Sequence, residues 1–367
     1  MLNEQILQLT DELVRIPSVS GDVWKNDECI DFVHSYFDNI SNARIQKIYY
    51  ENKPSLIVSN FDWRWSDVVL NGHVDVVPAN DQHQFEPLLD WNLLYWRWAG
   101  DMKSGIAIMT LLMKQLLEEN YSKKVSLIIT SDEEVGWGNW VWSLTKDWYW
   151  WDVVLIPDWW TTNQIVVCQK WIMIFSVKAY GKSCHSSRPW LWENAIDNLI
   201  RLYELLKNFF ENPKKLYWPD NWWCSVNMNI ISAGLWKNVI PDSAEATFDI
   251  RFTEDFTNNY VIDKIQELVK MCNSEISDKI FGSLLATDEK DDIVQKFYQT
   301  VKNELPDSQV DLIKEHGWSD WRFFAEAWAK VLLQRPECGN LHWKDEWVNI
   351  DTFLPVYNSF YNFLKSL

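Results

Sequence analysis

The chain contains the stretch Val68-Val69-Leu70-Asn71-Gly72-His73-Val74-Asp75-Val76-Val77-Pro78. Its apolar first residues predict a buried strand, which ends at the Asn-Gly pair. His73 and Asp75 follow, and in an extended chain this spacing places both side chains on the same side. One imidazole can ligate a metal ion while a nearby carboxylate orients it. The stretch therefore predicts a strand that presents a metal ligand at its carboxyl end.

Other candidate ligands occur at or just past predicted strands. They are Gly100-Asp101-Met102-Lys103, Asp132-Glu133-Glu134, Asp158 and His342. Binding sites of open α/β sheets collect outside the carboxyl ends of the strands. We therefore expect these residues to converge on His73.

Two metal ions about 3.5–4 Å apart can share a hydroxide and clamp the oxygens of a hydrolytic transition state. Such a pair needs a bridging carboxylate, terminal ligands on each ion and a nearby base. Five residues can supply the ligands: His73, Asp101, Glu134, Asp158 and His342. Asp101 is the natural bridge, and Glu133 can act as the base when its neighbour is a ligand. Mixed imidazole and carboxylate ligation fits zinc, with cobalt or manganese as substitutes.

The composition limits the possible partners. The formal net charge of −18, from 52 acidic and 34 basic residues, argues against a nucleic-acid surface. No apolar run reaches the length of a membrane span, and the first residues lack the apolar core of a signal peptide. The six cysteines are scattered, which is typical of reduced thiols. We expect a cytoplasmic protein without a nucleic-acid or membrane partner.

Strands and helices alternate through the first 171 residues and again from residue 285. This order predicts an α/β fold, with a mixed, mostly parallel sheet and helices on both faces. Residues 81–95 are expected to form a loop. The helices are expected at 6–16, 26–40, 104–118, 292–304 and 350–364, and the strands at 55–59, 68–70, 125–130, 153–156 and 330–334.

The pattern between these parts differs. It reads strand, helix, strand, strand, helix, at 172–179, 196–210, 225–232, 245–251 and 260–272. This order is typical of a compact α+β, ferredoxin-like unit. We therefore expect a catalytic domain in two parts, 1–171 and 285–367, with an inserted dimerisation or lid domain at 172–284.

The motifs, taken in order, resemble the dinuclear zinc peptidase and deacylase family of succinyl-diaminopimelate desuccinylase, acetylornithine deacetylase and glutamate carboxypeptidase. The resemblance covers nearly the whole chain. It rests on Gly72–Pro78, Ala99–Gly105, Thr130–Gly136, Gly181–Ser187, Asn238–Pro241, Asp249–Arg251 and Ser319–Arg322.

The resemblance implies a role for each site residue. His73 and Asp158 would hold one zinc ion, Glu134 and His342 the other, and Asp101 would bridge them. Asp75 would orient His73, and Glu133 would be the general base. His185 is similar to the oxyanion-stabilising histidine that acts on the partner's site in dimeric members, although it can also be an ordinary histidine. The implied substrate contacts are Arg251, Asn238 and Arg322, with a local salt bridge as the alternative for Arg251.

The resemblance implies a homodimeric hydrolase with two Zn²⁺ ions. It would cleave an amide bond in N-acyl amino acids or short peptides through a metal-bridging water. Whether it is a deacylase, a desuccinylase or an exopeptidase stays open.

The tryptophans leave open a second hypothesis for the function of this chain. There are 26 tryptophans and 11 glycines, whereas glycine normally makes up about 7% of a chain. Four tryptophans crowd the loops of the expected site and could block it in a non-catalytic metal- or ligand-binding homologue: Trp96, Trp98, Trp137 and Trp159. Alternatively, many of the tryptophans are UGA codons, which some genetic codes read as tryptophan and others as glycine. The family pattern has glycine where this chain has Trp96, Trp98, Trp137, Trp192, Trp318 and Trp321.

Overall fold

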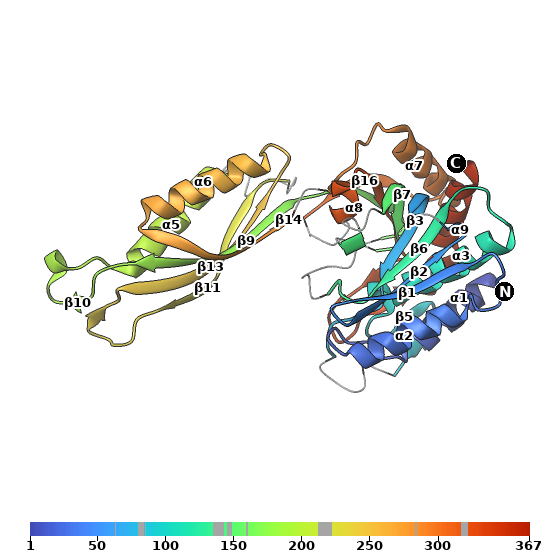
Figure 1. Ribbon diagram of the computed structural model, residues 1–367, viewed down its shortest axis with the longest axis horizontal. Helices are drawn as coiled ribbons and strands as arrows, with labels where there is room; N and C mark the ends of the chain where they lie inside the picture. Colours follow the sequence, from blue (N-terminus) through green and yellow to red (C-terminus); the bar gives the residue numbers. More distant parts are fainter. Residues whose placement is uncertain are drawn as a thin grey trace. The chain divides into compact units, whose positions relative to one another are not determined.

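The computed structural model describes the chain except residues 63, 80–83, 85, 135–142, 145–148, 159–160, 212–221, 283–284 and 317–321. It divides into two compact units. Unit 1 comprises Met1–Cys168, Ala286–Ile313 and Ser319–Leu367, and unit 2 comprises Gln169–Leu285 and Lys314–Trp318. In Figure 1, unit 1 contains the blue, cyan and red segments, and unit 2 contains most of the light-green and yellow ones.

Unit 1 is built on a nine-stranded mixed sheet. The sheet order is β1 (Arg44–Tyr50), β2 (Lys53–Ser59), β6 (Val125–Thr130), β3 (Trp65–His73), β7 (Trp150–Ile156), β17 (Lys330–Leu333), β8 (Gln164–Gln169) and β15 (Leu285–Ala286), and β16 (Asp311–Glu315) pairs with β8. The four strands from β6 to β17 are parallel, whereas the pairs β1–β2, β2–β6 and β17–β8 are antiparallel. The α/β fold with a mostly parallel central sheet is confirmed.

The helices of unit 1 pack on this sheet and on one another. They are α1 (Leu2–Val14), α2 (Val23–Ser35), α3 (Ser104–Glu118), α7 (Asp292–Glu304), α8 (Arg322–Glu326) and α9 (Phe353–Ser366). Helix α3 contacts β3 and β6 as well as α1 and α9, so it is buried on most of its surface. All six residues of β6 are buried, which requires cover on both faces of the sheet. None of the described helices has both the length and the apolar character needed to cross a membrane.

Some element boundaries differ from the sequence expectation. Residues 81–95 were expected to form a loop, but they contain β4 (Leu88–Asp90) and β5 (Leu93–Tyr95). These strands belong to a small sheet with β18 (Cys338–Gly339) and β19 (Trp347–Asn349). Strands of two or three residues are too short to show a periodic apolar pattern, which is why the sequence did not reveal them. The closing helix begins at Phe353, after a 3₁₀ turn at Ile350–Thr352.

Unit 2 has an antiparallel four-stranded sheet covered by two helices. Its elements follow in the order β9 (Trp171–Tyr180), β10 (Cys184–His185), α5 (Ala195–Phe210), β11 (Ser225–Ala233), β12 (Val239–Ile240), β13 (Ser243–Phe252), α6 (Asn258–Met271) and β14 (Ser274–Gly282), with a 3₁₀ turn at Pro189–Leu191. The sheet order is β11-β13-β9-β14, so the last of these strands along the chain, β14, pairs with the first, β9. This is a βαββαβ arrangement of the ferredoxin-like kind.

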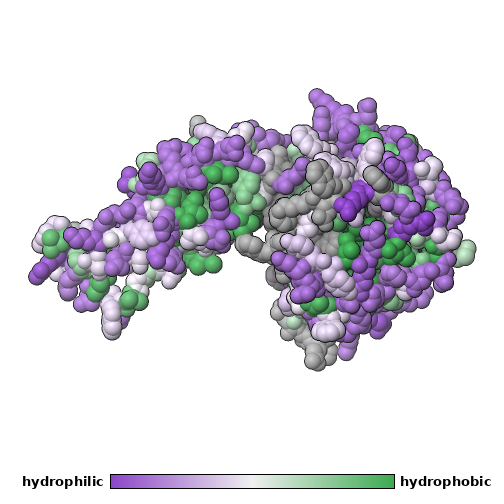
Figure 2. Space-filling model, in the orientation of Figure 1, coloured by the Kyte–Doolittle hydropathy of each residue, from purple (hydrophilic) through white to green (hydrophobic). Residues whose placement is uncertain are grey.

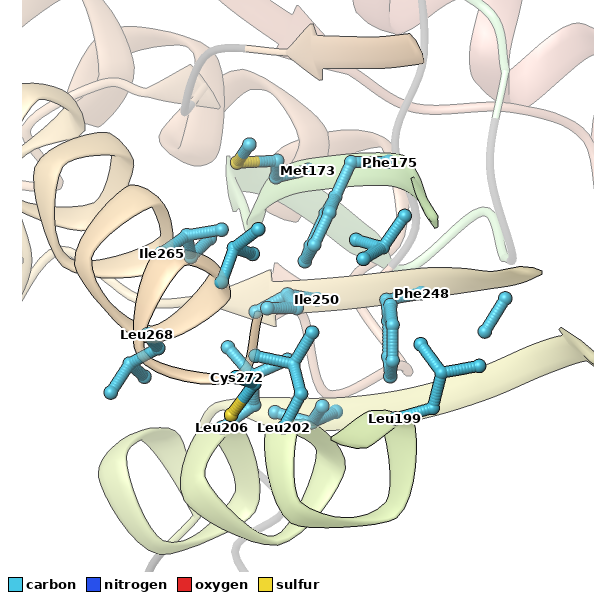
Figure 3. Close-up of a cluster of buried hydrophobic side chains, with 14 of the residues drawn as sticks. Met173, Phe175, Leu199, Leu202, Leu206, Phe248, Ile250, Ile265, Leu268 and Cys272 are labelled. Atoms are coloured by element: carbon cyan, nitrogen blue, oxygen red, sulfur yellow. The ribbon is translucent and has the colours of Figure 1, made fainter. Parts of the chain in front are cut away.

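One face of this sheet and the two helices enclose the core of unit 2 (Figure 3). The buried residues of α5 recur every three or four positions at Ala195, Leu199, Leu202, Leu206 and Phe210, which places them on one side of the helix. They meet alternate residues of β9 and β13, whose side chains share one face of the sheet. The periodicity of the sequence therefore determines which faces of unit 2 pack together.

Three tryptophans have backbone conformations that are typical of glycine. Trp91 (φ 56°) is the first residue of the two-residue turn between β4 and β5, and of the two turn residues it alone has a positive φ. This is the pattern of a type II′ hairpin, whose first central residue is normally glycine. Trp98 has φ 78° and ψ 2°, in the left-handed region.

The third case, Trp328 (φ 68°), follows helix α8. Its N–H donates to Ala325 O and the next N–H, of Ala329, donates to Phe324 O, both at 3.0 Å. These two bonds form a Schellman motif, in which the left-handed position is usually glycine. By contrast, Trp192 is extended (φ −120°) and needs no glycine. Trp137, Trp318 and Trp321 lie outside the described residues.

Candidate metal centre

The parallel strands deliver the candidate ligands to one edge of the sheet. His73 is the last residue of β3 and pairs in register with Thr130, the last residue of β6. Glu134 lies in the turn that follows β6, and Asp158 lies two residues beyond β7. Because parallel strands end at the same edge, these residues come together as the strand order implies.

The segment that carries Asp101 approaches this edge through Gly105. A Cβ at Gly105 would lie 2.7 Å from the carbonyl oxygen of Pro157, which is closer than side chains allow. Only glycine lets the first turn of α3 come this close to the residue before Asp158. The segment Gly100–Gly105 therefore begins helix α3 and also allows the segment that carries Asp101 to pack against the segment that carries Asp158.

The structure brings the five predicted ligands together in two groups. His73, Asp101 and Asp158 form one group, and Asp101, Glu134 and His342 form the other, with one ligand atom from each residue within 4.8 Å of the others. Asp101 belongs to both groups.

The oxygens of Asp101 point to opposite sides of the centre. Its Oδ1 lies 3.4 Å from His73 Nε2, and its Oδ2 lies 3.3 Å from His342 Nε2. Glu134 Oε1 also lies 3.3 Å from His342 Nε2. Asp101 is therefore placed between the two imidazoles, as a bridging ligand would be.

The donor atoms fit divalent metal ions. His73 Nδ1 lies 2.9 Å from the carbonyl oxygen of Asp75 and donates to it, which leaves Nε2 of the neutral ring unprotonated and able to bind a metal. His73 Nε2 and Glu134 Oε1 are buried, and neither makes a hydrogen bond within the described part of the chain. Buried polar atoms normally have partners, and a metal ion would provide one for both.

The charges of the centre also favour bound cations. Burial alone would lower the pKa of His73, but the neighbouring carboxylates of Asp101 and Asp75 and the charge of Glu133 raise that pKa well above its usual value. The carboxylates of Asp101 and then Glu134, each 3.3 Å from His342 Nε2, raise the pKa of His342 to about 10. Burial raises the pKa of the Glu134 carboxyl. The carboxylates thus favour positive charge at both imidazoles, and metal ions can supply that charge in place of protons.

The carboxylate of Asp75 also contacts the turn that carries Glu133 and Glu134. Its Oδ1 accepts the N–H of Glu133 and its Oδ2 accepts the N–H of Glu134, each at 3.1 Å. Ser20 Oγ also donates to Oδ2, at 2.9 Å. The carbonyl oxygen of Asp75 holds the His73 ring, whereas its carboxylate oxygens lie farther from that ring, with Oδ1 3.6 Å from Nδ1. Asp75 therefore contacts the Glu133–Glu134 turn as well as His73.

Sequence reasoning missed two buried charged residues. Arg335 Nη1 donates to Asp158 Oδ1 at 2.9 Å. Glu346 accepts two backbone N–H groups beside Asp101, and burial raises its pKa to about 7. The signal for Arg335 was present, because it follows β17, which pairs with β7 so that Leu333 aligns with Ile156. Continuing that register places Arg335 beside Asp158.

Two candidates of unit 2 lie at one end of its sheet. His185 is exposed and pairs with Val239 between the short strands β10 and β12. The N–H of Ser187 donates to His185 Nδ1 at 3.3 Å, so the neutral ring carries its proton on Nε2. Asn238 is exposed, and its carbonyl oxygen accepts the N–H of Ser186.

Arg251 lies on β13, toward the opposite end of the same sheet. Its Nε and Nη2 donate to the two oxygens of Asp249 at 2.8 and 3.0 Å. The salt bridge that the sequence left open is therefore present. The side chain of Arg322 lies outside the described part of the chain.

Of the four tryptophans expected to crowd the site, two can be located. Trp96 and Trp98 are buried, and the Trp98 indole donates to Val77 O and lies over Lys103 Nζ, 5.2 Å from the ring centre. Both indoles fill the protein interior, which is unlike a side chain that blocks an open site. Trp137 and Trp159 lie outside the described residues.

Comparison with known proteins identifies relatives along the whole chain. The sequence profile of peptidase family M20/M25/M40 matches residues 69–366. An uncharacterized metallohydrolase of Methanocaldococcus jannaschii is 26% identical over 358 residues, which cover 86% of this chain and 83% of that protein.

Two solved structures share the fold. A tripeptidase from Staphylococcus aureus has a TM-score of 0.78 at 17% identity, covering 99% of this chain and 98% of that one. An M20 family metallo-carboxypeptidase from Sulfolobus solfataricus has a TM-score of 0.77 at 16% identity, covering 98% of each chain.

Proposed function

Because the chain belongs to peptidase family M20/M25/M40 and is a metallohydrolase acting on peptide bonds, we propose that it uses two zinc ions to cleave an amide bond in N-acyl amino acids or short peptides. The observation that carries this proposal is the pair of ligand groups that share Asp101. Cobalt or manganese would serve as substitutes, since both accept imidazole and carboxylate ligands.

His73 and Asp158 would hold one ion, Glu134 and His342 the other, and Asp101 both. When bound, the metal pair would polarise the scissile carbonyl and lower the pKa of water. The chain supplies the geometry: Asp75 holds His73 and the Glu133–Glu134 turn, and Arg335 holds Asp158.

Glu133 is the proposed general base. It belongs to neither ligand group, yet its Oε2 lies 3.9 Å from His73 Nε2 and therefore beside the centre. Glu133 would accept a proton from the attacking water as the new C–O bond forms. It would return this proton to the amine nitrogen as the C–N bond breaks, so the carboxylate is regenerated.

His185 is the proposed oxyanion donor, acting on the site of a second subunit. The chain enters unit 2 at the Trp171 end of β9, and His185 lies beyond the Tyr180 end. The ten residues of β9 span about 30 Å at roughly 3.3 Å per residue. A residue so far from the point of attachment is well placed to reach a partner, and its Nε2–H is the donor that an oxyanion needs.

The surface of unit 2 supports a homodimer as the partner. Strand β11 is at the edge of its sheet, and the exposed apolar residues on and after it are Ile230, Ile231, Leu235, Trp236 and Val239. Hydrophobic residues are visible on unit 2 in Figure 2. An exposed apolar edge strand favours pairing with another chain, and a second copy would present the same strand.

The substrate would carry a free carboxylate. Arg251 is the proposed contact, because its bonds to Asp249 leave Nη1 for an additional carboxylate oxygen. Asn238 and Arg322 are proposed further substrate contacts. We also propose a cytoplasmic location, in keeping with the six free cysteines.

A metal assay combined with a substrate panel tests the proposal. Purified protein should contain two zinc ions and hydrolyse at least one of a set of N-acetyl and N-succinyl amino acids and dipeptides. The preferred member distinguishes deacylase, desuccinylase and peptidase. Two bound metal ions without turnover of any member would instead favour the non-catalytic homologue.

A further inference from the structure

Glu346 is a buried carboxylate that connects two ligand segments. It lies four residues after His342 and directly before β19, and only 1% of its surface is exposed. Its carbonyl oxygen accepts the N–H of Trp96 at 3.0 Å, which extends the pairing of β19 with β5 toward Asp101. The segment that carries His342 thus runs alongside the segment that leads to Asp101.

The side chain of Glu346 contacts the backbone of Asp101 directly. Its Oε1 accepts the N–H of Gly100 at 3.0 Å and the N–H of Asp101 at 3.2 Å. A Cβ at Gly100 would lie 2.9 Å from Cys338 Cβ, so only glycine allows this close approach. One carboxylate oxygen therefore fixes two consecutive N–H groups at the residue whose side chain faces both imidazoles.

The position of Asp101 matters to both ligand groups at once. Its two oxygens lie 3.4 Å from His73 Nε2 and 3.3 Å from His342 Nε2. A rotation of the Gly100–Asp101 backbone would move both oxygens together. A residue that fixes this backbone therefore acts on both metal positions, whereas a terminal ligand such as Asp158 acts mainly on one.

We propose that Glu346 is a positioning residue for the bridging carboxylate, which it holds through the N–H groups of Gly100 and Asp101 so that both metal positions are formed. This inference rests on the proposed dinuclear centre. It assigns to Glu346 a geometric task that requires an acceptor oxygen at a defined distance from the backbone of Asp101.

Two substitutions separate geometry from charge. Glu346→Gln keeps an acceptor oxygen at the same distance but removes the charge. Glu346→Asp keeps the charge but shortens the side chain by one methylene. If the task is geometric, Gln replaces Glu well and Asp does not.

The measurement is competition for metal between the protein and a chromophoric chelator, which resolves the affinity of each position without reference to turnover. We expect Glu346→Gln to bind both ions within about threefold of wild type, and Glu346→Asp to bind both about 10–100-fold more weakly, the usual effect of losing a residue that orients metal ligands. Asp158→Asn is the reference for one position and should weaken mainly one binding step.

Asp67→Asn is the matched control. Asp67 Oδ2 also accepts a backbone N–H, that of Lys124, but at the opposite end of β3 from His73. It should leave both metal affinities unchanged.

Wild-type affinity at both positions in Glu346→Asp would overturn the inference, as would weakening of one position alone. A large loss in Glu346→Gln with normal binding in Glu346→Asp would show that charge, and not geometry, is the requirement. If wild-type protein itself bound fewer than two ions, the proposed centre would be wrong, which is a separate outcome.

Discussion

The carboxylate of Asp75 accepts the backbone N–H of Glu133, at 3.1 Å from Oδ1. Its other oxygen accepts the next N–H along the turn, that of Glu134. One carboxylate therefore fixes the proposed base and a proposed ligand, while the carbonyl oxygen of the same residue holds His73. Consequently, a defect at position 75 should reach the histidine and the acidic turn together.

We expect Asp75→Asn to lower kcat/KM and to weaken metal binding at the Glu134 position, each about 10–100-fold. An amide side chain has only one acceptor oxygen. Its NH₂ group would face one of the two backbone N–H groups of the turn, which would then lose its acceptor. Steady-state kinetics with metal titration measures both effects. Ser20→Ala removes a single bond to Oδ2 and should cost much less. Unchanged metal binding in Asp75→Asn would show that the turn is held by other contacts.

Glu133→Ala should retain both metal ions but lose hydrolysis by several orders of magnitude. The reason is that Glu133 is assigned to proton transfer and belongs to neither ligand group. Metal analysis and turnover of the same preparation provide the measurement. Glu134→Ala is the matched control and should lose metal. If Glu133→Ala loses metal instead, the roles of these two residues are exchanged.

Arg335→Met should destabilise the metal-free protein by about 3–5 kcal/mol, because it leaves the buried Asp158 carboxylate without its partner. Bound metal ions would partly replace the missing charge, so the loss should be smaller in the metal-loaded protein. Urea unfolding with and without a chelator gives the two values. Arg44→Met removes an exposed ion pair with Asp62 and should cost less than about 1 kcal/mol. An equal loss with and without metal would contradict the pairing of Arg335 with a metal ligand.

Mixing His185→Ala protein with Glu133→Ala protein should restore activity if His185 acts in the partner's site. Random exchange of subunits gives half heterodimers, each with one intact site of two, so about one quarter of wild-type activity is expected. The assay is turnover after exchange, with exchange itself followed by differently tagged subunits. If demonstrated heterodimers recover no activity, His185 acts in the site of its own subunit or takes no part in catalysis.

The protein made in its own cells should contain glycine at positions 91, 98 and 328. Each position has a positive φ, and the turns at 91 and 328 are types that normally place glycine there. Peptide masses of the native protein, read beside the gene's codons, decide this. Tryptophan masses, or UGG codons at these positions, would show that the indoles are genuine.

The positive φ at position 91 also has a consequence for the stability of recombinant protein that carries tryptophan there. Trp91→Gly should raise the free energy of unfolding by about 1 kcal/mol, since a left-handed conformation strains a bulky residue. Trp24→Gly is the matched control: its side chain is 85% exposed, against 93% for Trp91, but it lies in helix α2, where glycine costs up to about 1 kcal/mol. Destabilisation by both substitutions would argue against strain at position 91.

Long, regular elements could be predicted from the sequence because their apolar spacing is unambiguous. Helices α3 and α7 and strand β6 have the expected bounds. The convergence of His73 and Asp158 also followed from strand order, since parallel strands end at one edge. The roles assigned to the site residues stay predictions for the experiments above.

Other contacts could not be predicted because they join distant segments through the backbone. The bonds from Asp75 to the Glu133–Glu134 turn and from Glu346 to the Asp101 backbone depend on loop geometry that no local pattern encodes. The pairing of β4 with β5 was missed for a similar reason, because a three-residue strand has no measurable period.

The place of β17 in the sheet has a consequence for synthesis in the cell. This strand comes from the last part of the chain, yet it lies between β7 and β8, which come from the first part. During translation at about 5–20 residues per second, the ribosome must make all of unit 2 before β17 emerges, a delay on the order of ten seconds or more. Throughout that interval β7 presents an open edge to other nascent chains. Newly made protein should therefore depend on chaperones until its last strand is inserted.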